Sequence, residues 1–224
     1  MKQQAFEYPI AARFGRSDFL VSASNRAALE WIERWPNWGA RALVLYGPRG
    51  SGKTHLAHLW CAHSRALIIP GTGVGDPPPA GITAIAIDDA DCAAEEPLLH
   101  FYNSAVERDV ALLLTMRAPP AALPVALPDL ASRLRALPVA GIAPPDDELL
   151  SGVLIKHFAD RGLHVAPAVI RYLVRRIERS FAAASAIAAR LDQAALSARS
   201  PVTVRLAREL LTGYSEPPSD LTVT

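Results

Sequence analysis

One segment of the sequence combines glycines, a lysine and a hydroxyl side chain in a spacing suited to phosphate binding. Residues 47–54 read Gly-Pro-Arg-Gly-Ser-Gly-Lys-Thr and fit the pattern G-x-x-x-x-G-K-[ST]. An apolar run at 42–46 precedes the segment and a helical pattern at 54–64 follows it, as this motif requires. We therefore expect a loop whose backbone N–H groups surround phosphate oxygens, with Lys53 on the β- and γ-phosphates and Thr54 on Mg²⁺. The residues expected to bind the nucleotide here are Gly47, Pro48, Arg49, Gly50, Ser51, Gly52, Lys53, Thr54 and His55.

Two acidic residues end another apolar run. Asp88 and Asp89 directly follow Ile85-Ala86-Ile87. Ligands of parallel α/β sheets bind at the carboxyl ends of the strands, where both carboxylates would lie. We expect Asp88 to complete a Mg²⁺ site with Thr54, and Asp89 to polarise an attacking water molecule.

The apolar runs predict the elements that position these residues. They are continuous, which is typical of parallel strands buried on both faces, and they cover 42–46, 66–69, 82–87, 110–114 and 139–142. Helical patterns alternate with them, so we expect an α/β fold with a five-stranded parallel sheet and helices on both sides. This P-loop NTPase domain would span residues 15–145, because Pro144-Pro145 is a natural boundary. Beyond it we expect an all-helical lid at 146–212, with tails at 1–14 and 213–224.

Composition narrows the function classes. The 224 residues carry a net charge of +1 and only two cysteines, and no apolar run is long enough to cross a membrane. We expect a reduced, cytoplasmic protein with no signal peptide. Residues 161–208 contain nine arginines and two acidic residues, a formal charge of +7. This basic segment is either a solvated face or a surface for phosphate or a protein partner.

The motifs resemble the AAA+ family, and more narrowly the bacterial replication initiator DnaA and its short regulatory relatives of the Hda type. The phosphate loop, the Asp88-Asp89 pair and the string Leu-Pro-Asp-Leu-Ala-Ser-Arg-Leu at 127–134 carry the resemblance, which covers about residues 4–212. It implies ADP or ATP and Mg²⁺ as cofactors. It also implies an adenine contact by Asp18, Phe19, Leu20 and Val21.

The same resemblance gives Arg133 a role. From spacing alone it is a surface arginine on a loop, and Arg135 is its neighbour. In the family, an arginine in this string acts in trans on the γ-phosphate held by a partner. Such an arginine finger stabilises the charge that develops during phosphoryl transfer.

The sequence also departs from the family pattern. Arg117 stands where the initiators have an acidic residue that senses the γ-phosphate, and Ala183 stands where they have a lid arginine. Arg179, Arg176 and Arg190 are the open candidates to replace that lid arginine. We therefore expect weak or no intrinsic ATPase activity and a resting ADP state. The segment 70–81 is too short for the helices with which initiators hold single-stranded DNA, so we expect no sequence-specific DNA binding.

The N-terminal residues resemble a degenerate sliding-clamp-binding peptide. Gln3, Phe6 and Tyr8 would bind the β subunit of DNA polymerase III as an extended segment. The resemblance implies a negative regulator of replication initiation that promotes hydrolysis of DnaA-bound ATP. Two alternative functions stay open, namely a self-contained ATPase of the helicase-loader type and a nucleotide-gated adaptor without catalytic contribution. Whether the chain forms a homodimer is also open.

Overall fold

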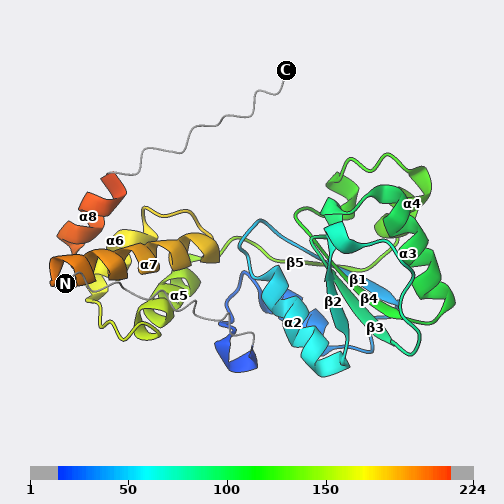
Figure 1. The fold of residues 1–224 in the computed structure, drawn as a ribbon, viewed down its shortest axis with the longest axis horizontal. Coiled ribbons are helices and arrows are strands. Elements are labelled where there is room, and N and C mark those ends of the chain that lie inside the picture. The colour runs from blue at the N-terminus through cyan, green and yellow to red at the C-terminus, as the bar shows by residue number, and fades with distance from the viewer. Residues whose placement is uncertain (1–14, 213–224) are drawn as a thin grey trace, which may run out of the picture. The chain divides into compact units, whose positions relative to one another are not determined.

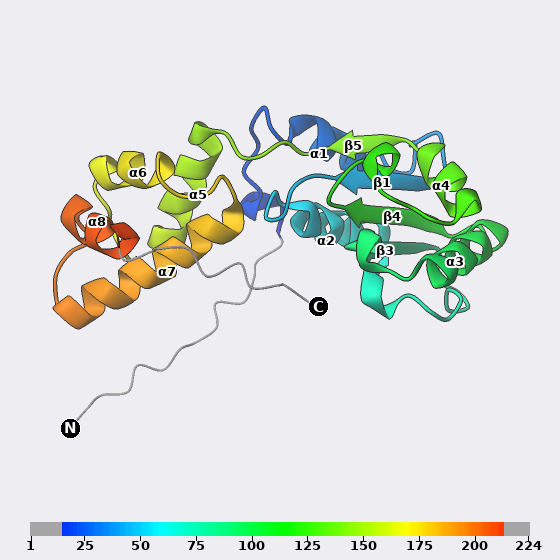
Figure 2. The same cartoon turned by 90° about the horizontal axis from the view of Figure 1, so that it is seen from above.

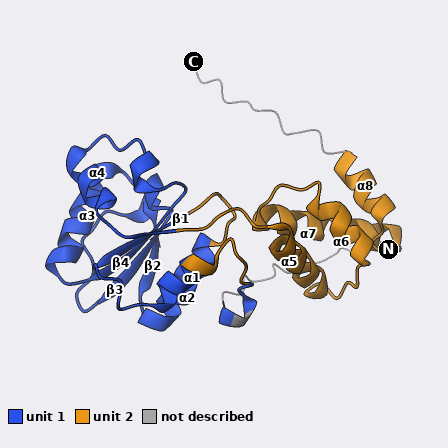
Figure 3. Ribbon diagram, turned by 180° about the vertical axis from the view of Figure 1, so that it is seen from behind, with its two compact units in different colours: residues 1–20, 28–46, 53–140 blue, residues 21–27, 47–52, 141–224 orange. Residues whose placement is uncertain are grey.

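The computed structural model of the chain describes residues 15–212. The described chain divides into two compact units, which Figure 3 distinguishes by colour. The sheet unit comprises residues up to 20, 28–46 and 53–140, and the helical unit comprises 21–27, 47–52 and the residues from 141 onward. The phosphate-loop segment 47–52 therefore clusters with the helical unit, whereas Lys53 and Thr54 belong to the sheet unit.

A five-stranded sheet forms the centre of the sheet unit (Figure 1). Its strands are β1 (Ala42–Tyr46), β2 (Leu67–Pro70), β3 (Ala84–Asp88), β4 (Ala111–Met116) and β5 (Val139–Gly141), in the spatial order β2-β3-β4-β1-β5. The pairs β2–β3, β3–β4 and β4–β1 are parallel. The predicted α/β fold with its five strands is confirmed.

The two edge strands differ from the prediction of burial on both faces. β1, β3 and β4 are buried almost throughout, but Leu67 of β2 and Val139 of β5 are each 43% exposed. An edge strand has a neighbour on one side only, so part of its surface stays in water. The continuous apolar runs correctly predicted where the strands lie. The prediction that the two outer strands are fully buried was wrong.

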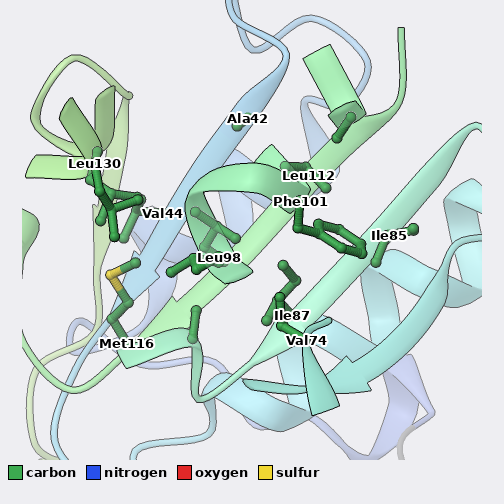
Figure 4. Close-up of a cluster of buried hydrophobic side chains, with 14 of the residues drawn as sticks. Ala42, Val44, Val74, Ile85, Ile87, Leu98, Phe101, Leu112, Met116 and Leu130 are labelled. Atoms are coloured by element: carbon green, nitrogen blue, oxygen red, sulfur yellow. The ribbon is translucent and has the colours of Figure 1, made fainter. Parts of the chain in front are cut away.

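Helices cover the sheet in the sheet unit. They are α1 (Arg26–Glu33), α2 (Lys53–Ser64), α3 (Glu95–Glu107) and α4 (Pro128–Arg135), with short 3-10 helices η1 (Arg16–Asp18), η2 (Gly71–Gly73), η3 (Ala90–Cys92) and η4 (Pro120–Ala122). Figure 4 shows Leu98 and Phe101 of α3 and Leu130 of α4 packed over β-strand residues such as Val44 and Ile85. This core fixes α3 and α4 against the sheet.

The helical unit is built from α5 (Asp147–Ala159), α6 (Pro167–Val174), α7 (Phe181–Ala198) and α8 (Val204–Thr212), which Figure 2 shows grouped together. A second apolar core joins them, with Leu150, Phe158, Leu173 and Leu191 almost fully buried. Three of the helices have side-chain N-caps: Asp146 accepts the Leu149 N–H on α5, Ser180 accepts the Ala183 N–H on α7, and Thr203 accepts the Leu206 N–H on α8. Within residues 15–212, no helix has both the length and the apolar character needed to span a bilayer.

Candidate functional site

The phosphate-loop segment folds into a tight turn that depends on glycine. Gly50 and Gly52 have φ angles of +71° and +98°, which side-chain-bearing residues rarely adopt. The Ser51 N–H donates to the Pro48 carbonyl at 3.2 Å and closes the turn. Turns of this kind direct successive N–H groups to one side and form an anion-binding concavity.

The loop is in contact with the N-terminus of α7 inside the helical unit. The Phe181 N–H donates to the Gly50 carbonyl at 2.9 Å. A Cβ atom on Gly50 would lie 3.0 Å from Cβ of Ser180, so a side chain there would press on the helix start. The contact uses the main chain at both ends.

Lys53 begins α2 and is 6% exposed. Burial lowers the pKa of this ammonium group, and the carboxylates of Asp89, Asp88 and Asp91 oppose that shift. The lysine is therefore desolvated but stays near three negative charges, an arrangement that holds a cation ready for an anionic ligand.

The carboxylate of Asp88 joins two hydroxyl groups. Thr54 Oγ1 donates to one of its oxygens at 2.8 Å, and Thr115 Oγ1 donates to the other at 2.6 Å. The expected metal residues Thr54 and Asp88 are thus in direct contact. Within residues 15–212, no three His, Cys, Asp or Glu side chains are grouped as a metal site, so any bound cation would need ligand oxygens as well.

Asp89, the expected water-polarising residue, has a left-handed backbone with φ 51° and is exposed. Its N–H donates to Thr115 Oγ1 at 2.8 Å. A Cβ atom on Gly71 would lie 2.1 Å from the Asp89 carbonyl oxygen, so the neighbouring turn must have glycine. Asp89 is held by its backbone while its side chain faces solvent.

Sequence reasoning missed Thr115 as a site residue. It is fully buried at the end of β4 and serves both Asp88 and Asp89. The signal was present: Thr115 is the first polar residue after the run 110–114, and the parallel register Ile87–Leu114 brings it opposite Asp88.

Arg117 follows β4 directly, near Asp88 and Asp89, but its contacts are with Asp91 and Cys92. Its backbone N–H donates to Asp91 Oδ2 at 3.2 Å, and its guanidinium lies 3.3 Å from Cys92 Sγ and 3.8 Å from Asp91. The side chain is 58% exposed. Its charge also lowers the pKa of Lys53, so Arg117 stands near the same edge of the sheet.

Arg133 is on a helix rather than the loop that spacing alone favoured. Its Nη2 lies 3.0 Å from Asp129 Oδ2 one turn earlier, and its side chain is 38% exposed. Its Nε is buried and has no acceptor within the described residues. The entry to α4 is fixed by Glu95, which accepts the N–H groups of Ala126 and Leu127 at 2.9 and 2.7 Å.

The segment expected at the adenine lies beside the start of α2. Phe19 is 5% exposed and packs edge-on against His55 with ring centroids 5.2 Å apart. Asn25 accepts the Ser22 N–H at 2.9 Å, while Val21 is partly exposed. Gln3, Phe6 and Tyr8 lie outside the described residues.

One family and several solved structures are similar to this chain. Residues 146–211 match the family described as Hda, lid domain. Domain III of the Thermotoga maritima replication initiation protein DnaA has a similar structure, with a TM-score of 0.74 and 18% identity over 91% of this chain and 98% of that one.

Two further structures share the fold. DnaA bound to AMPPCP and single-stranded DNA has a TM-score of 0.65 and 16% identity, covering 82% of this chain and 67% of that one. The Thermotoga maritima RuvB Holliday junction branch migration motor has a TM-score of 0.64 and 15% identity, covering 84% and 65%. Residues 146–211 therefore belong to the Hda lid family, and the described chain has a fold similar to that of DnaA domain III.

Proposed function

We propose that this chain is a nucleotide-binding negative regulator of DNA replication initiation. It would bind the DNA polymerase sliding clamp and promote hydrolysis of ATP on DnaA by presenting Arg133 in trans. Its relationship to Hda-type proteins supports the choice of partner. The arrangement of Arg133 on α4 is the observation on which the catalytic part rests.

The phosphate-loop residues support ADP or ATP as the chain's own ligand. Lys53 supplies a desolvated cation, and the backbone of 47–52 supplies N–H donors. Thr54 and Asp88 would hold Mg²⁺ together with the phosphates, and the metal when bound offsets phosphate charge. A DnaA of the same fold binds the ATP analogue AMPPCP, which fits this assignment.

Arg133 has the properties of an arginine that acts on a partner. The pKa of Lys53 responds to Asp89, Asp88, Asp91 and Arg117, whereas the charge of Arg133 acts on Tyr102 of α3. Arg133 is thus associated with the α3–α4 surface and not with the chain's own lysine. Asp129 limits the rotamers of the side chain while leaving more than a third of it exposed.

The N-terminal peptide would supply the clamp contact. Gln3 would satisfy polar groups of the clamp, and Phe6 and Tyr8 would fill an apolar pocket. Alanine at these three positions should abolish capture of the chain on immobilised clamp while leaving its nucleotide binding intact. Unchanged capture would refute this contact.

The catalytic proposal is tested with DnaA loaded with labelled ATP, clamp on DNA and this chain. Arg133→Ala should lower the stimulated hydrolysis by about 10³-fold or more, the range of arginine fingers supplied in trans. Arg135→Ala is the matched control, because Arg135 is exposed on the same helix and its substitution removes the same charge. Full turnover with Arg133→Ala, or equal losses in both variants, would refute the finger.

The same variants separate the alternatives. A self-contained ATPase would hydrolyse ATP without DnaA and lose activity on Asp89→Ala. A nucleotide-gated adaptor would bind DnaA in a Lys53-dependent manner and be indifferent to Arg133. Either pattern would replace the proposed mechanism.

Nucleotide binding is tested by thermal unfolding with and without ADP or ATP. Ligand at about 100 times its Kd stabilises a protein by about 2.7 kcal/mol. Lys53→Ala should abolish the shift. Thr115→Val should reduce it, because Asp88 and Asp89 then lose a shared hydrogen-bond partner. Unchanged nucleotide shifts in both variants would exclude this site.

A further inference from the structure

Helix α6 has an apolar face and an arginine-rich face. The apolar face enters the core of the helical unit and consists of Val169, Ile170, Leu173 and Val174. The opposite face contains Arg171, Arg175 and Arg176, where Arg175 and Arg176 directly follow the last helical residue. Tyr172 lies at the border of the two faces, partly buried against the core. Burial of one side of the helix thus places the arginines together on the other side.

Two of these arginines lack a counter-charge. Arg171 and Arg175 are exposed, and no described residue forms an ion pair with either side chain. They are four positions apart and so point to the same side of the helix. Glu178 and Asp192 are the only acidic residues between 161 and 208. The face therefore has an uncompensated positive charge.

Tyr172 does not offer a free ring. The Arg176 guanidinium lies 3.9 Å from its centroid, and Nη1 donates to the Tyr172 carbonyl at 3.4 Å. A covered ring cannot serve as a stacking platform for unpaired bases, on which single-strand binders depend. The cation–π contact instead holds a third guanidinium on the arginine face.

The face also lacks the apolar centre of a protein interface. Such interfaces have a core poor in charge and rich in aromatic and apolar side chains. The large exposed hydrophobic residues of the helical unit are Val21, Ile155 on α5 and Leu196 on α7, and none of them lies on α6. Unpaired guanidinium groups without an apolar centre fit the regularly spaced phosphates of a nucleic acid backbone.

We propose that the arginine face of α6 binds the phosphate backbone of duplex DNA without reading its sequence. Arg171, Arg175 and Arg176 would contact phosphates, releasing the counterions that surround the duplex. This surface is independent of the phosphate loop and of Arg133. It gives the chain a weak affinity for DNA, which raises its local concentration near partners on the same duplex.

The test is the salt dependence of binding to a fluorescently labelled duplex of arbitrary sequence, followed by anisotropy. The triple variant Arg171→Gln/Arg175→Gln/Arg176→Gln should reduce the slope of log K against log salt by about 2–3, since each phosphate contact contributes about 0.9. The matched control is Arg16→Gln/Arg34→Gln/Arg41→Gln in the sheet unit, which removes the same charge from other exposed positions. The control should retain the wild-type slope.

Three outcomes would overturn the proposal. Equal losses in both triple variants would attribute binding to net charge. Tighter binding of a single strand of the same length would assign the face to unpaired nucleic acid. No measurable binding at low salt would leave no DNA contact at all. Circular dichroism and thermal unfolding confirm that the variants are folded, and the assay contains neither nucleotide nor DnaA, so its result is separate from the proposed function.

Discussion

Helices α4 and α6 are similar in length and in their first residue, but Arg133 of α4 forms an ion pair and the arginines of α6 form none with any described residue. Each has eight residues, starts with proline at the first turn and carries arginine in its last turn. On α4, Asp129 pairs with Arg133 at a distance of one turn. On α6, the corresponding surface has no acidic residue, and Arg171 and Arg175 remain exposed.

The difference separates two uses of a guanidinium group. Catalysis requires one group at a fixed position, because a reacting centre tolerates little displacement. Attraction to a polyanion requires several mobile charges and no fixed geometry. A single aspartate in the first turn is therefore enough to distinguish the two helices. Substitutions at Arg133, Asp129 and Ala168 test whether this difference between the two helices matters.

Arg133→Lys should have the largest effect. Lysine keeps the charge but loses the planar fork of donors, and it cannot pair with Asp129 in the same way. We expect stimulated hydrolysis of DnaA-bound ATP to fall by at least ~10²-fold, less than the ~10³-fold or more expected for complete loss of the finger because the charge is kept. Single-turnover rates on the DnaA–ATP complex measure this effect. Lysine at near wild-type rate would mean that only charge matters and that α4 resembles α6.

Asp129→Asn should have a smaller effect on the same reaction. The arginine keeps its charge but samples more rotamers, so we expect the rate constant to fall on the order of 10-fold, below the ~10²-fold that a displacement of 1 Å can cost. Affinity for DnaA should stay constant. Asp129→Glu should restore part of the rate. A change in affinity with an unchanged rate constant would assign Asp129 to docking instead of positioning.

Ala168→Glu converts α6 toward the α4 pattern. Ala168 is exposed in the first turn, three residues before Arg171. The new carboxylate should pair with Arg171 and reduce the salt slope of DNA binding by about 1. It should also stabilise the protein by about 0.2–0.5 kcal/mol as a helical ion pair. Ala168→Gln is the neutral control. Unchanged DNA binding in the glutamate variant would argue against the arginine face as a DNA contact.

The smallest effect concerns Tyr102. Burial raises the pKa of this phenol, and the positive charge of Arg133 lowers it again. Removing the cation with Arg133→Ala should therefore raise the pKa of Tyr102 further. Absorbance titration of the phenolate, with Tyr102→Phe to identify the signal, measures the change. An unchanged pKa would place the Arg133 charge away from Tyr102.

The central part of the fold followed from the sequence because it depends on local patterns. Continuous apolar runs predicted the strands, and the loop at 47–54 and the acids at 88–89 were found where ligands of parallel sheets bind. The exposure of β2 and β5 could not be predicted, because strand order is a property of the whole sheet. The strands in the two outer positions of the sheet, β2 and β5, are the ones that are partly exposed to water.

Other site features required contacts between distant residues. Thr115 and Asp88 are 27 positions apart, and only the β3–β4 register brings them together. The α4 helix had local signals, namely Pro128 at the start and Asp129 one turn before Arg133, but the attachment of its N-terminus to Glu95 had none. Pairwise side-chain geometry is the part that sequence patterns do not encode.

The hydrogen bond from Phe181 to Gly50 has a consequence for genetics. Because the donor is a backbone N–H, an alanine scan of α7 would be blind to it. Phe181→Pro compared with Phe181→Ala would expose it, since both variants lose the phenyl ring, a first-turn proline suits the extended backbone of Ser180, and only proline also removes the donor. A backbone hydrogen bond of this kind allows the side chain at position 181 to vary while the loop stays attached to the start of α7.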